Sequence, residues 1–77
     1  MDFLVNLRGV EDVKKFCGKA KKYSDIMVKN RGRSFTVDGS SILGVFSLNL
    51  MAPVEVHIEN IKDGEVFKED VQEFVIV

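Results

Sequence analysis

An apolar side chain at every second position marks two short stretches of the chain. In residues 3–7 (FLVNL) every second side chain is apolar and points to one side, and residues 54–60 (VEVHIEN) repeat that pattern. Because successive side chains of a β-strand point to opposite faces, each stretch predicts a strand with one buried face. A sheet covered on one side only is typical of antiparallel strands.

Residues 26–37 predict a β-hairpin. Ile26 and Val28 alternate with less apolar positions, and Phe35 and Val37 do the same after the Asn-Arg-Gly turn at residues 30–32. Asparagine and glycine supply the backbone conformations that tight turns need, so the two halves are expected to pair. Phe35 is thereby expected on the core face of the sheet.

Residues 10–23 show the period of an amphipathic helix. Glu11 and Asp12 stand near its start and several lysines near its end, an order that suits the helix dipole. The apolar residues recur three or four positions apart, which predicts a buried stripe along one side. They are Val10, Val13, Phe16, Cys17 and Ala20.

A short apolar helix is expected after Asp38 and Gly39. It begins at Ser40 and Ser41 and is almost entirely apolar up to residue 50. Pro53 lacks the amide hydrogen that a helix interior needs, so the helix is expected to end before it.

Residues 65–74 predict a last helix, preceded by a turn at residues 62–64 (KDG). Phe67, Val71 and Phe74 repeat at helical spacing and would share its buried side. The predicted order is β-α-β-β-α-β-α, an α+β open-faced β-sandwich with a four-stranded antiparallel sheet and helices on one face. A chain of 77 residues is expected to form one domain, spanning residues 1–77.

Composition adds the expected compartment. The chain is 45% hydrophobic and 30% charged, as in ordinary globular domains. No apolar run approaches the roughly 18–20 residues of a membrane span, and the N-terminal segment lacks the basic start of a signal peptide. The single Cys17 cannot form an internal disulfide. These features predict a cytoplasmic protein.

Charge is divided unevenly along the chain. Residues 1–37 contain nine Lys/Arg and four Asp/Glu, a balance of +5, and residues 38–77 contain two Lys/Arg and eight Asp/Glu, a balance of −6. Such asymmetry either marks a surface for an anionic partner or draws two neighbouring elements together.

Nucleic-acid binding through the lysines of residues 14–22 is one alternative that this charge raises, since phosphate contacts need only positive charge. Binding of single strands also needs exposed aromatic side chains. Phe16 and Phe35 are expected in the core, which leaves only Tyr23, so nucleic-acid binding is the less favoured alternative.

His57 is the only histidine and therefore the natural candidate for acid–base or phosphoryl chemistry. It lies in mid-strand between Glu55 and Glu59, whose carboxylates favour the charged imidazolium, so a surface histidine is the simpler interpretation. These three residues alone make a weak metal site. Cys17 is expected in the core with no activating base. No catalytic, phosphate-loop or zinc motif is present, so we expect neither enzymatic activity nor a cofactor.

Ser40 and Ser41 have two interpretations. A serine hydroxyl at a helix start accepts a hydrogen bond from an unpaired backbone amide, which makes it an N-cap. The same position suits regulatory phosphorylation, because a phosphate there meets free amides and the positive end of the helix dipole.

Residues 32–50 (GRSFTVDGSSILGVFSLNL) resemble the central segment of HPr, the histidine-containing phosphocarrier of the bacterial phosphotransferase system. The matching residues are Ser41, Ile42, Leu43, Gly44, Val45, Phe46, Ser47 and Leu48. The resemblance implies the HPr fold over nearly the whole chain. It also implies that Ser41 is a regulatory phosphorylation site.

The chain departs from HPr where the phosphorylated histidine should open the first helix. The corresponding region around Arg8, Gly9 and Val10 contains no histidine and no proline, and Glu11 and Asp12 follow it. These acids would repel a phosphoryl group. We interpret residues 8–10 as a vestigial phosphocarrier region.

The resemblance therefore implies a protein-binding or regulatory module of the HPr type. In HPr the second helix is the docking surface, which by position assigns Ile42, Leu43 and Phe46 to a protein-docking patch here. The competing interpretation places these side chains in the core. A phosphoryl carrier that uses His57 remains the other functional alternative.

Overall fold

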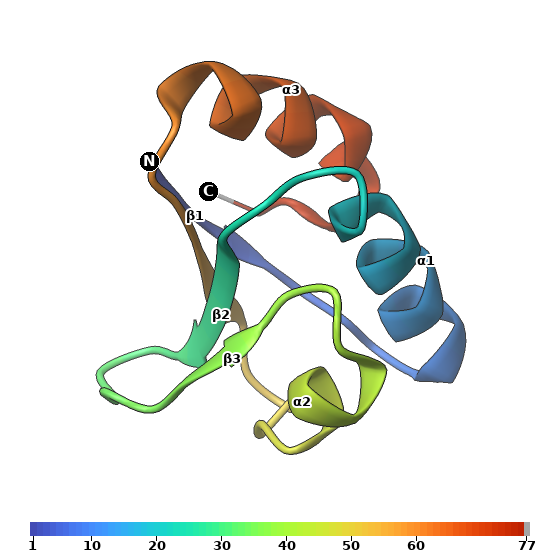
Figure 1. The fold of residues 1–77 in the computed structure, drawn as a ribbon. Helices are drawn as coiled ribbons and strands as arrows, with labels where there is room; N and C mark the ends of the chain where they lie inside the picture. The colour runs from blue at the N-terminus through green and yellow to red at the C-terminus, as the bar shows by residue number, and fades with distance from the viewer. Residues whose placement is uncertain (77) are drawn as a thin grey trace.

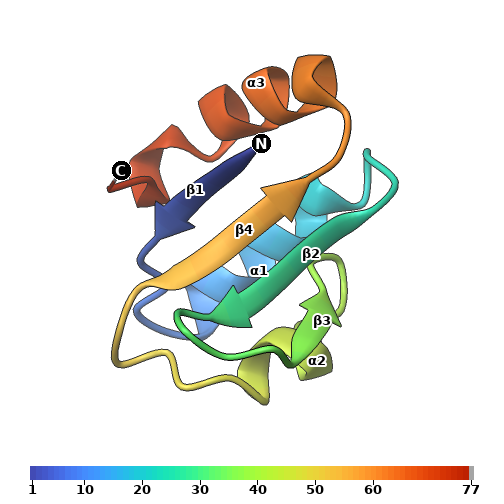
Figure 2. The ribbon, with the colours of Figure 1, turned by 90° about the vertical axis from the view of Figure 1, so that its left-hand side faces the viewer.

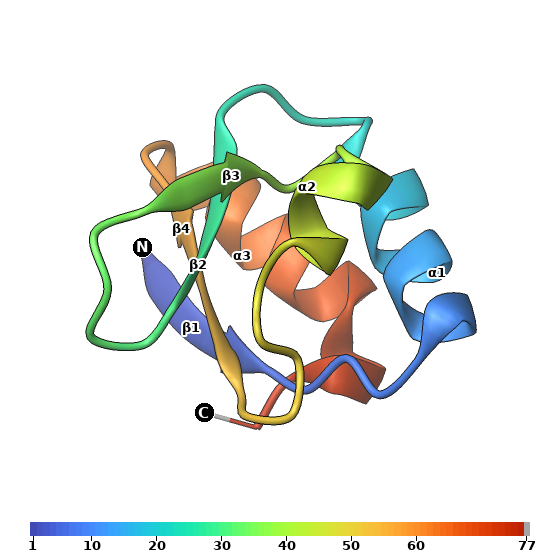
Figure 3. The same cartoon turned by 90° about the horizontal axis from the view of Figure 1, so that it is seen from below.

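A four-stranded antiparallel sheet forms one layer of the protein, and the helices form the other (Figures 1 and 3). The computed structural model describes residues 1–76. Its elements in chain order are β1 (Asp2–Val5), α1 (Val10–Ala20), β2 (Ile26–Asn30), β3 (Thr36–Asp38), α2 (Ile42–Phe46), β4 (Val54–Ile58) and α3 (Ile61–Asp70), followed by a 3-10 turn (Gln72–Phe74). The predicted α+β class and β-α-β-β-α-β-α order are confirmed.

The strand order in the sheet is β1-β4-β2-β3, with all neighbours antiparallel (Figure 2). β4 lies in the middle, where Val56 faces Phe3 on one side and Val28 on the other. The alternation seen in the sequence holds in β4, since Val54, Val56 and Ile58 are buried and the intervening residues are not. The expected dry and wet faces of the sheet are therefore present.

The core lies between the sheet and the helices. Phe67 of α3 is fully buried at its centre, and its ring centroid lies 5.3 Å from that of Phe16, 5.3 Å from that of Tyr23 and 6.3 Å from that of Phe3. Strand, first helix and last helix thus meet at one aromatic cluster. Val71 and Phe74 are buried as predicted.

The C-terminal segment covers the outer edge of β1. The amide of Asn6 donates to the carbonyl of Phe74 at 2.8 Å, and the amide of Ile76 donates to that of Leu4 at 3.0 Å. An uncovered strand edge offers free hydrogen-bonding groups to other chains. Among residues 1–76, this cover leaves the three-residue β3 as the one strand at an open edge. None of the helices in residues 1–76 has both the length and the apolarity to cross a membrane.

Two predictions about the helices are wrong. Val10 is 54% exposed, because it is the first residue of α1 and its side chain precedes the first turn packed on the core. The expected loop turn at residues 62–64 is the second error, because these residues belong to the start of α3. Asn60 caps this helix, and its side-chain oxygen accepts a hydrogen bond from the amide of Asp63. Glycine at position 64 leaves room for Met1, because a β-carbon there would lie 2.8 Å from the Met1 sulfur.

The prediction for Phe35 is also wrong, because its side chain is 64% exposed. Pairing in the hairpin begins only at Thr36, which lies opposite Lys29. Phe35 therefore belongs to a connecting loop of residues 31–35 that is longer than expected, where strand alternation no longer fixes the side of the sheet.

Candidate functional site

The approach to α2 is fixed by short polar contacts. One carboxylate oxygen of Asp38 accepts hydrogen bonds from the amide of Ser40 at 2.8 Å and from its hydroxyl at 2.7 Å. These bonds hold the pKa of Asp38 below its usual range. The hydroxyl of Ser41 accepts from the amide of Gly44 at 3.0 Å, so Ser41 is the N-cap of α2.

Three apolar side chains of α2 face outward. Leu43 is 84% exposed, Phe46 39% and Ile42 38%, whereas Val45 is fully buried and holds the helix to the core. We call Ile42, Leu43 and Phe46 the α2 patch. The structure thus rules out a purely core role for these three residues.

Residues 8–10, interpreted from the sequence as a vestigial phosphocarrier region, lie beside the segment that follows α2. A cavity of about 530 Å³ is lined by Arg8, Gly9, Leu50 and Met51, together with their neighbours in residues 6–7. The backbone amide of Arg8 donates to the Asp12 carboxylate at 3.0 Å. No lining side chain of this cavity within residues 1–76 offers a nucleophile or a base, so it has no group that could accept a phosphoryl group.

The positive side of this surface comes from α1, which packs against α2 (Figure 3). Lys14 of α1 and Lys21, the C-cap residue of this helix, lie at helical spacing from Cys17 and so fall on one stripe with it. Burial raises the pKa of the Cys17 thiol, while the charge of Lys21 lowers it and that of Asp38 raises it. Cys17 is thus a buried thiol on the inner side of α1.

The remaining α1 lysines explain part of the charge asymmetry. Lys15 and Lys19 lie 3.9 and 3.8 Å from the carboxylate of Glu73, and Lys19 also donates to the carbonyl of Asp70 at 2.7 Å. The basic N-terminal half and acidic C-terminal half thus meet across the helix layer. Lys14 and Lys21 have no such acidic partner within residues 1–76.

His57 lies away from the α2 patch, on the outer face of the sheet. Its Nδ1 atom lies 2.5 Å from the carboxylate of Asp2, the residue opposite it on β1, and its Nε2 atom lies 3.3 Å from that of Glu59. Asp2 first and Glu59 second raise the pKa of His57, and the same contact lowers the pKa of Asp2. Both ring nitrogens of His57 face carboxylates, and these would repel an incoming phosphoryl group, which counts against the carrier alternative.

The contact between His57 and Asp2 predicts a pH dependence of folding stability. Because the pKa of His57 is raised, its contribution to folding stability is fully present below about pH 6.5, the ordinary histidine value. This contribution is lost as the pH rises through the folded-state pKa of His57. The lowered pKa of Asp2 makes its contribution present above about pH 4 and lost as the solution is acidified further.

Urea unfolding between pH 5.5 and 8.5 should therefore show stability falling more steeply in the natural chain than in His57→Gln. Both side chains are about half exposed and screened by solvent, so the difference should stay under about 1 kcal/mol. Equal slopes for the two proteins would mean that the contact does not form in solution.

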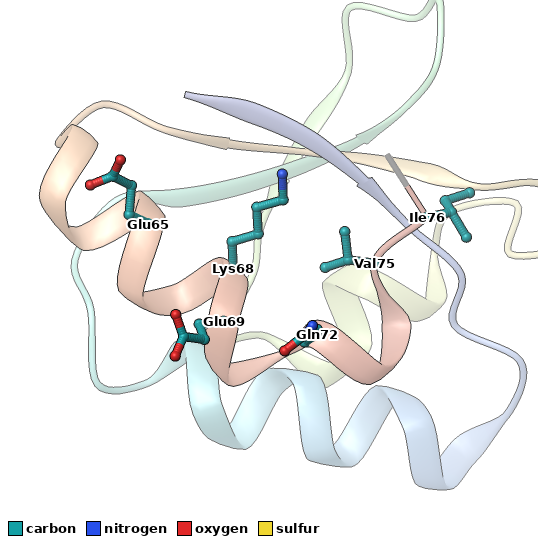
Figure 4. Close-up of a pocket in the computed structure, with 6 residues that line it drawn as sticks. All are labelled: Glu65, Lys68, Glu69, Gln72, Val75 and Ile76. Carbon is teal, nitrogen blue, oxygen red and sulfur yellow. The ribbon is translucent and has the colours of Figure 1, made fainter.

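Figure 4 shows a groove between α3 and the C-terminal segment that follows it. Its volume is about 540 Å³, and Glu65, Lys68 and Glu69 line it beside Val75 and Ile76. The ammonium group of Lys68 lies 5.8 Å from the centre of the Phe3 ring, so its cation is already engaged there. The groove carries both charge signs and no convergent catalytic set.

Sequence reasoning placed Ser41 and the α2 residues together and separated them from His57, as the structure does. It missed Asp2 as the partner of His57, because that pairing depends on the register of β1 against β4. Within residues 1–76, no three His, Cys, Asp or Glu side chains converge where a metal ion could bind. No family model matches this chain, and no curated protein or solved structure matches it significantly.

Proposed function

We propose that this chain is an HPr-like regulatory module that binds another protein through the α2 patch and does not carry phosphoryl groups. The observation that carries the proposal is the exposure of Ile42, Leu43 and Phe46 on one short helix. Exposed apolar side chains that cluster on one face are a common mark of protein binding sites. Leu43 in particular contributes little to the hydrophobic core, because 84% of it is exposed to solvent.

The partner's chemistry follows from what borders the patch. Helical spacing puts Lys14 and Lys21 on the side of α1 that carries Cys17, whose thiol is influenced by both Lys21 and Asp38, and neither lysine has an acidic partner among residues 1–76. Val10 adds exposed apolar surface at the start of the same stripe. Complementary charge at the rim of an interface steers association and fixes its orientation. The proposed partner therefore has an apolar contact surface with carboxylates opposite these two lysines.

The resemblance to HPr supports this interpretation. The β-α-β-β-α-β-α order agrees with the fold that the resemblance implies, and the Ser41–Leu48 motif coincides with α2 and its N-cap. HPr-like proteins that lack the histidine and keep the serine include regulators whose phosphoserine form binds a transcription factor repressing carbon-source genes. The proposed partner is a repressor of this type.

Phosphorylation of Ser41 is the regulatory step that we propose, with Ser40 as the other candidate. The Ser41 hydroxyl is partly buried and serves as the α2 cap, so a phosphate there would change both the start of α2 and the charge beside the patch. The Asp38 carboxylate, which accepts hydrogen bonds from Ser40, lies close by and would repel such a phosphate.

Intact-mass measurements after two incubations separate the regulatory from the carrier role. With ATP and the serine kinase of HPr, we expect a stable phosphate that maps to Ser41 and disappears in Ser41→Ala. With phosphoenolpyruvate and Enzyme I, the kinase that charges HPr, we expect no acid-labile phosphate. An acid-labile phosphate lost in His57→Ala would instead establish a carrier.

Substitution of the patch tests the docking role. Phe46→Asp should weaken binding of the repressor by at least tenfold, because it places an unpaired charge at the centre of an apolar contact. Val66→Asp is the matched control, since Val66 is 55% exposed on α3 and outside the patch. Equal affinities for the two variants, measured by titration calorimetry, would remove the α2 patch from the interface.

A further inference from the structure

A second concave surface lies between the β2–β3 loop and the segment that follows α2. The loop projects at the lower left of Figure 1, and Asn30, Arg31, Arg33 and Phe35 line the cavity from it. Asn49 lines it from the other segment. We call this cavity, of about 660 Å³, the loop pocket.

The walls of the loop pocket are joined by reciprocal hydrogen bonds. The side-chain amide of Asn30 donates to the carbonyl of Asn49 at 2.8 Å, and the backbone amide of Asn49 donates to the side-chain oxygen of Asn30 at 3.1 Å. The turn itself is closed by the amide of Arg33, which donates to the carbonyl of Asn30 at 3.1 Å, with Gly32 at a φ of 75°. The pocket is thus built before any ligand arrives.

Its charge is positive and uncompensated. Arg31 and Arg33 are exposed, and no carboxylate within residues 1–76 lies within ion-pair distance of either guanidinium. The nearest cation along β2, Lys29, is instead 4.0 Å from the Glu55 carboxylate. Two arginines separated by a single residue offer planar, forked donors that match the oxygens of a phosphate group.

Phe35 supplies an apolar face beside these donors. Its ring is 64% exposed, so the fold gains little from it. An exposed aromatic ring next to arginines is the combination that binds nucleotide bases by stacking while cations hold the phosphate. α1 lacks this combination, because Phe16 is buried and Tyr23 packs on Phe67 and bonds to Asp70.

We propose that the loop pocket binds a nucleotide group, with its base stacked on Phe35 and its phosphate held by Arg31 and Arg33. A free nucleotide and a nucleotide within a single strand present the same chemistry, and both fit a pocket of this size. An acidic peptide would satisfy the arginines but would leave the Phe35 face without a flat partner. The pocket is separate from the α2 patch.

The test is a titration of the isotope-labelled chain followed by amide chemical shifts. The probes are adenosine monophosphate, a single-stranded octauridylate, inorganic phosphate alone and adenosine alone. We expect shifts confined to residues 30–35 and 47–53 with either nucleotide probe, and weaker effects from phosphate or adenosine. Tighter binding of the octauridylate than of the mononucleotide would assign the site to single strands, and the reverse to free nucleotides.

Variants separate stacking from charge. Phe35→Ala should weaken nucleotide binding about tenfold, and Arg31→Gln with Arg33→Gln should abolish it. The charge-matched control is Lys15→Gln with Lys22→Gln, which removes two exposed lysines of the α1 region outside the border of the α2 patch and should leave binding unchanged.

Three results would overturn the proposal. They are the absence of any shift at millimolar nucleotide, shifts centred on α1 that vanish in the lysine variant, and binding that Phe35→Ala leaves intact. The last result would leave only an unspecific anion site.

Discussion

Replacing Phe67 by alanine should lower the free energy of unfolding by about 3–5 kcal/mol, the loss typical of a large buried aromatic side chain. Phe67 is fully buried and touches the rings of Phe3, Phe16 and Tyr23, which come from β1, α1 and the segment after it. Its removal leaves a cavity where three segments meet, and those segments cannot all close over the gap at once.

The size of this loss matters because small domains have little stability to spare. Folded domains are typically stable by about 5–15 kcal/mol, and a chain of this length is expected near the lower end.

Urea unfolding followed by circular dichroism measures the change in the free energy of unfolding. If the alanine variant does not fold, Phe67→Leu takes its place, with a smaller loss expected in the same direction. Val66→Ala is the control, since its exposed neighbouring position should change stability by less than about 0.5 kcal/mol. A loss below about 1 kcal/mol in Phe67→Ala would contradict the central position of this ring.

Replacing Gly39 by alanine should cost about 1–3 kcal/mol, the range for overpacking a filled site. A β-carbon at this position would lie 2.6 Å from Cγ2 of Ile26 and 3.2 Å from its carbonyl oxygen. Ile26 cannot move aside easily, because it is buried and β-branched and its carbonyl accepts the Gly39 amide at 2.8 Å. Gly39 therefore sets how closely the start of α2 approaches the sheet.

The same substitution at Gly18 should have the opposite sign. Gly18 lies inside α1, and a β-carbon there would meet nothing within 4 Å. Alanine at an unobstructed helix position should raise stability by about 0.5–1 kcal/mol. The two variants make the same glycine-to-alanine change at positions that differ in the space around the new β-carbon. Equal changes in stability would contradict the close approach of Ile26 to Gly39.

Local periodicity predicted the strands and the first helix because burial in those elements repeats along the chain. The alternation in Val54, Val56 and Ile58 is a direct consequence of a sheet with one covered face. Ser41 was predicted as a cap because a hydroxyl before an apolar run has a local partner three residues later.

What could not be predicted depends on partners far along the chain. Gly64 looked like a turn residue because nothing nearby in sequence reveals that Met1 packs against it. Asp2 gave no sign of its contact with His57, which exists only through the register of β1 and β4. Phe35 looked like a strand residue, although the point at which hairpin pairing ends left it in a loop.

The candidate site was predictable only in part. The motif at residues 41–48 located the α2 patch through its resemblance to HPr, and the structure adds how far each side chain is exposed. The lysine border came from the packing of α1 on α2, and the loop pocket from the Asn30–Asn49 contact. Both arise from elements that are distant in sequence.

The most direct test of the central claim is to map the surface that a partner covers. The isotope-labelled, Ser41-phosphorylated chain is titrated with the repressor that binds phosphoserine HPr, and amide chemical shifts are followed residue by residue. We predict the largest changes at Ile42, Leu43 and Phe46, extending to Lys14 and Lys21 on α1. Changes confined to the α3 groove or to the outer face of the sheet around His57, or no change at all, would contradict the proposal that this protein acts through α2.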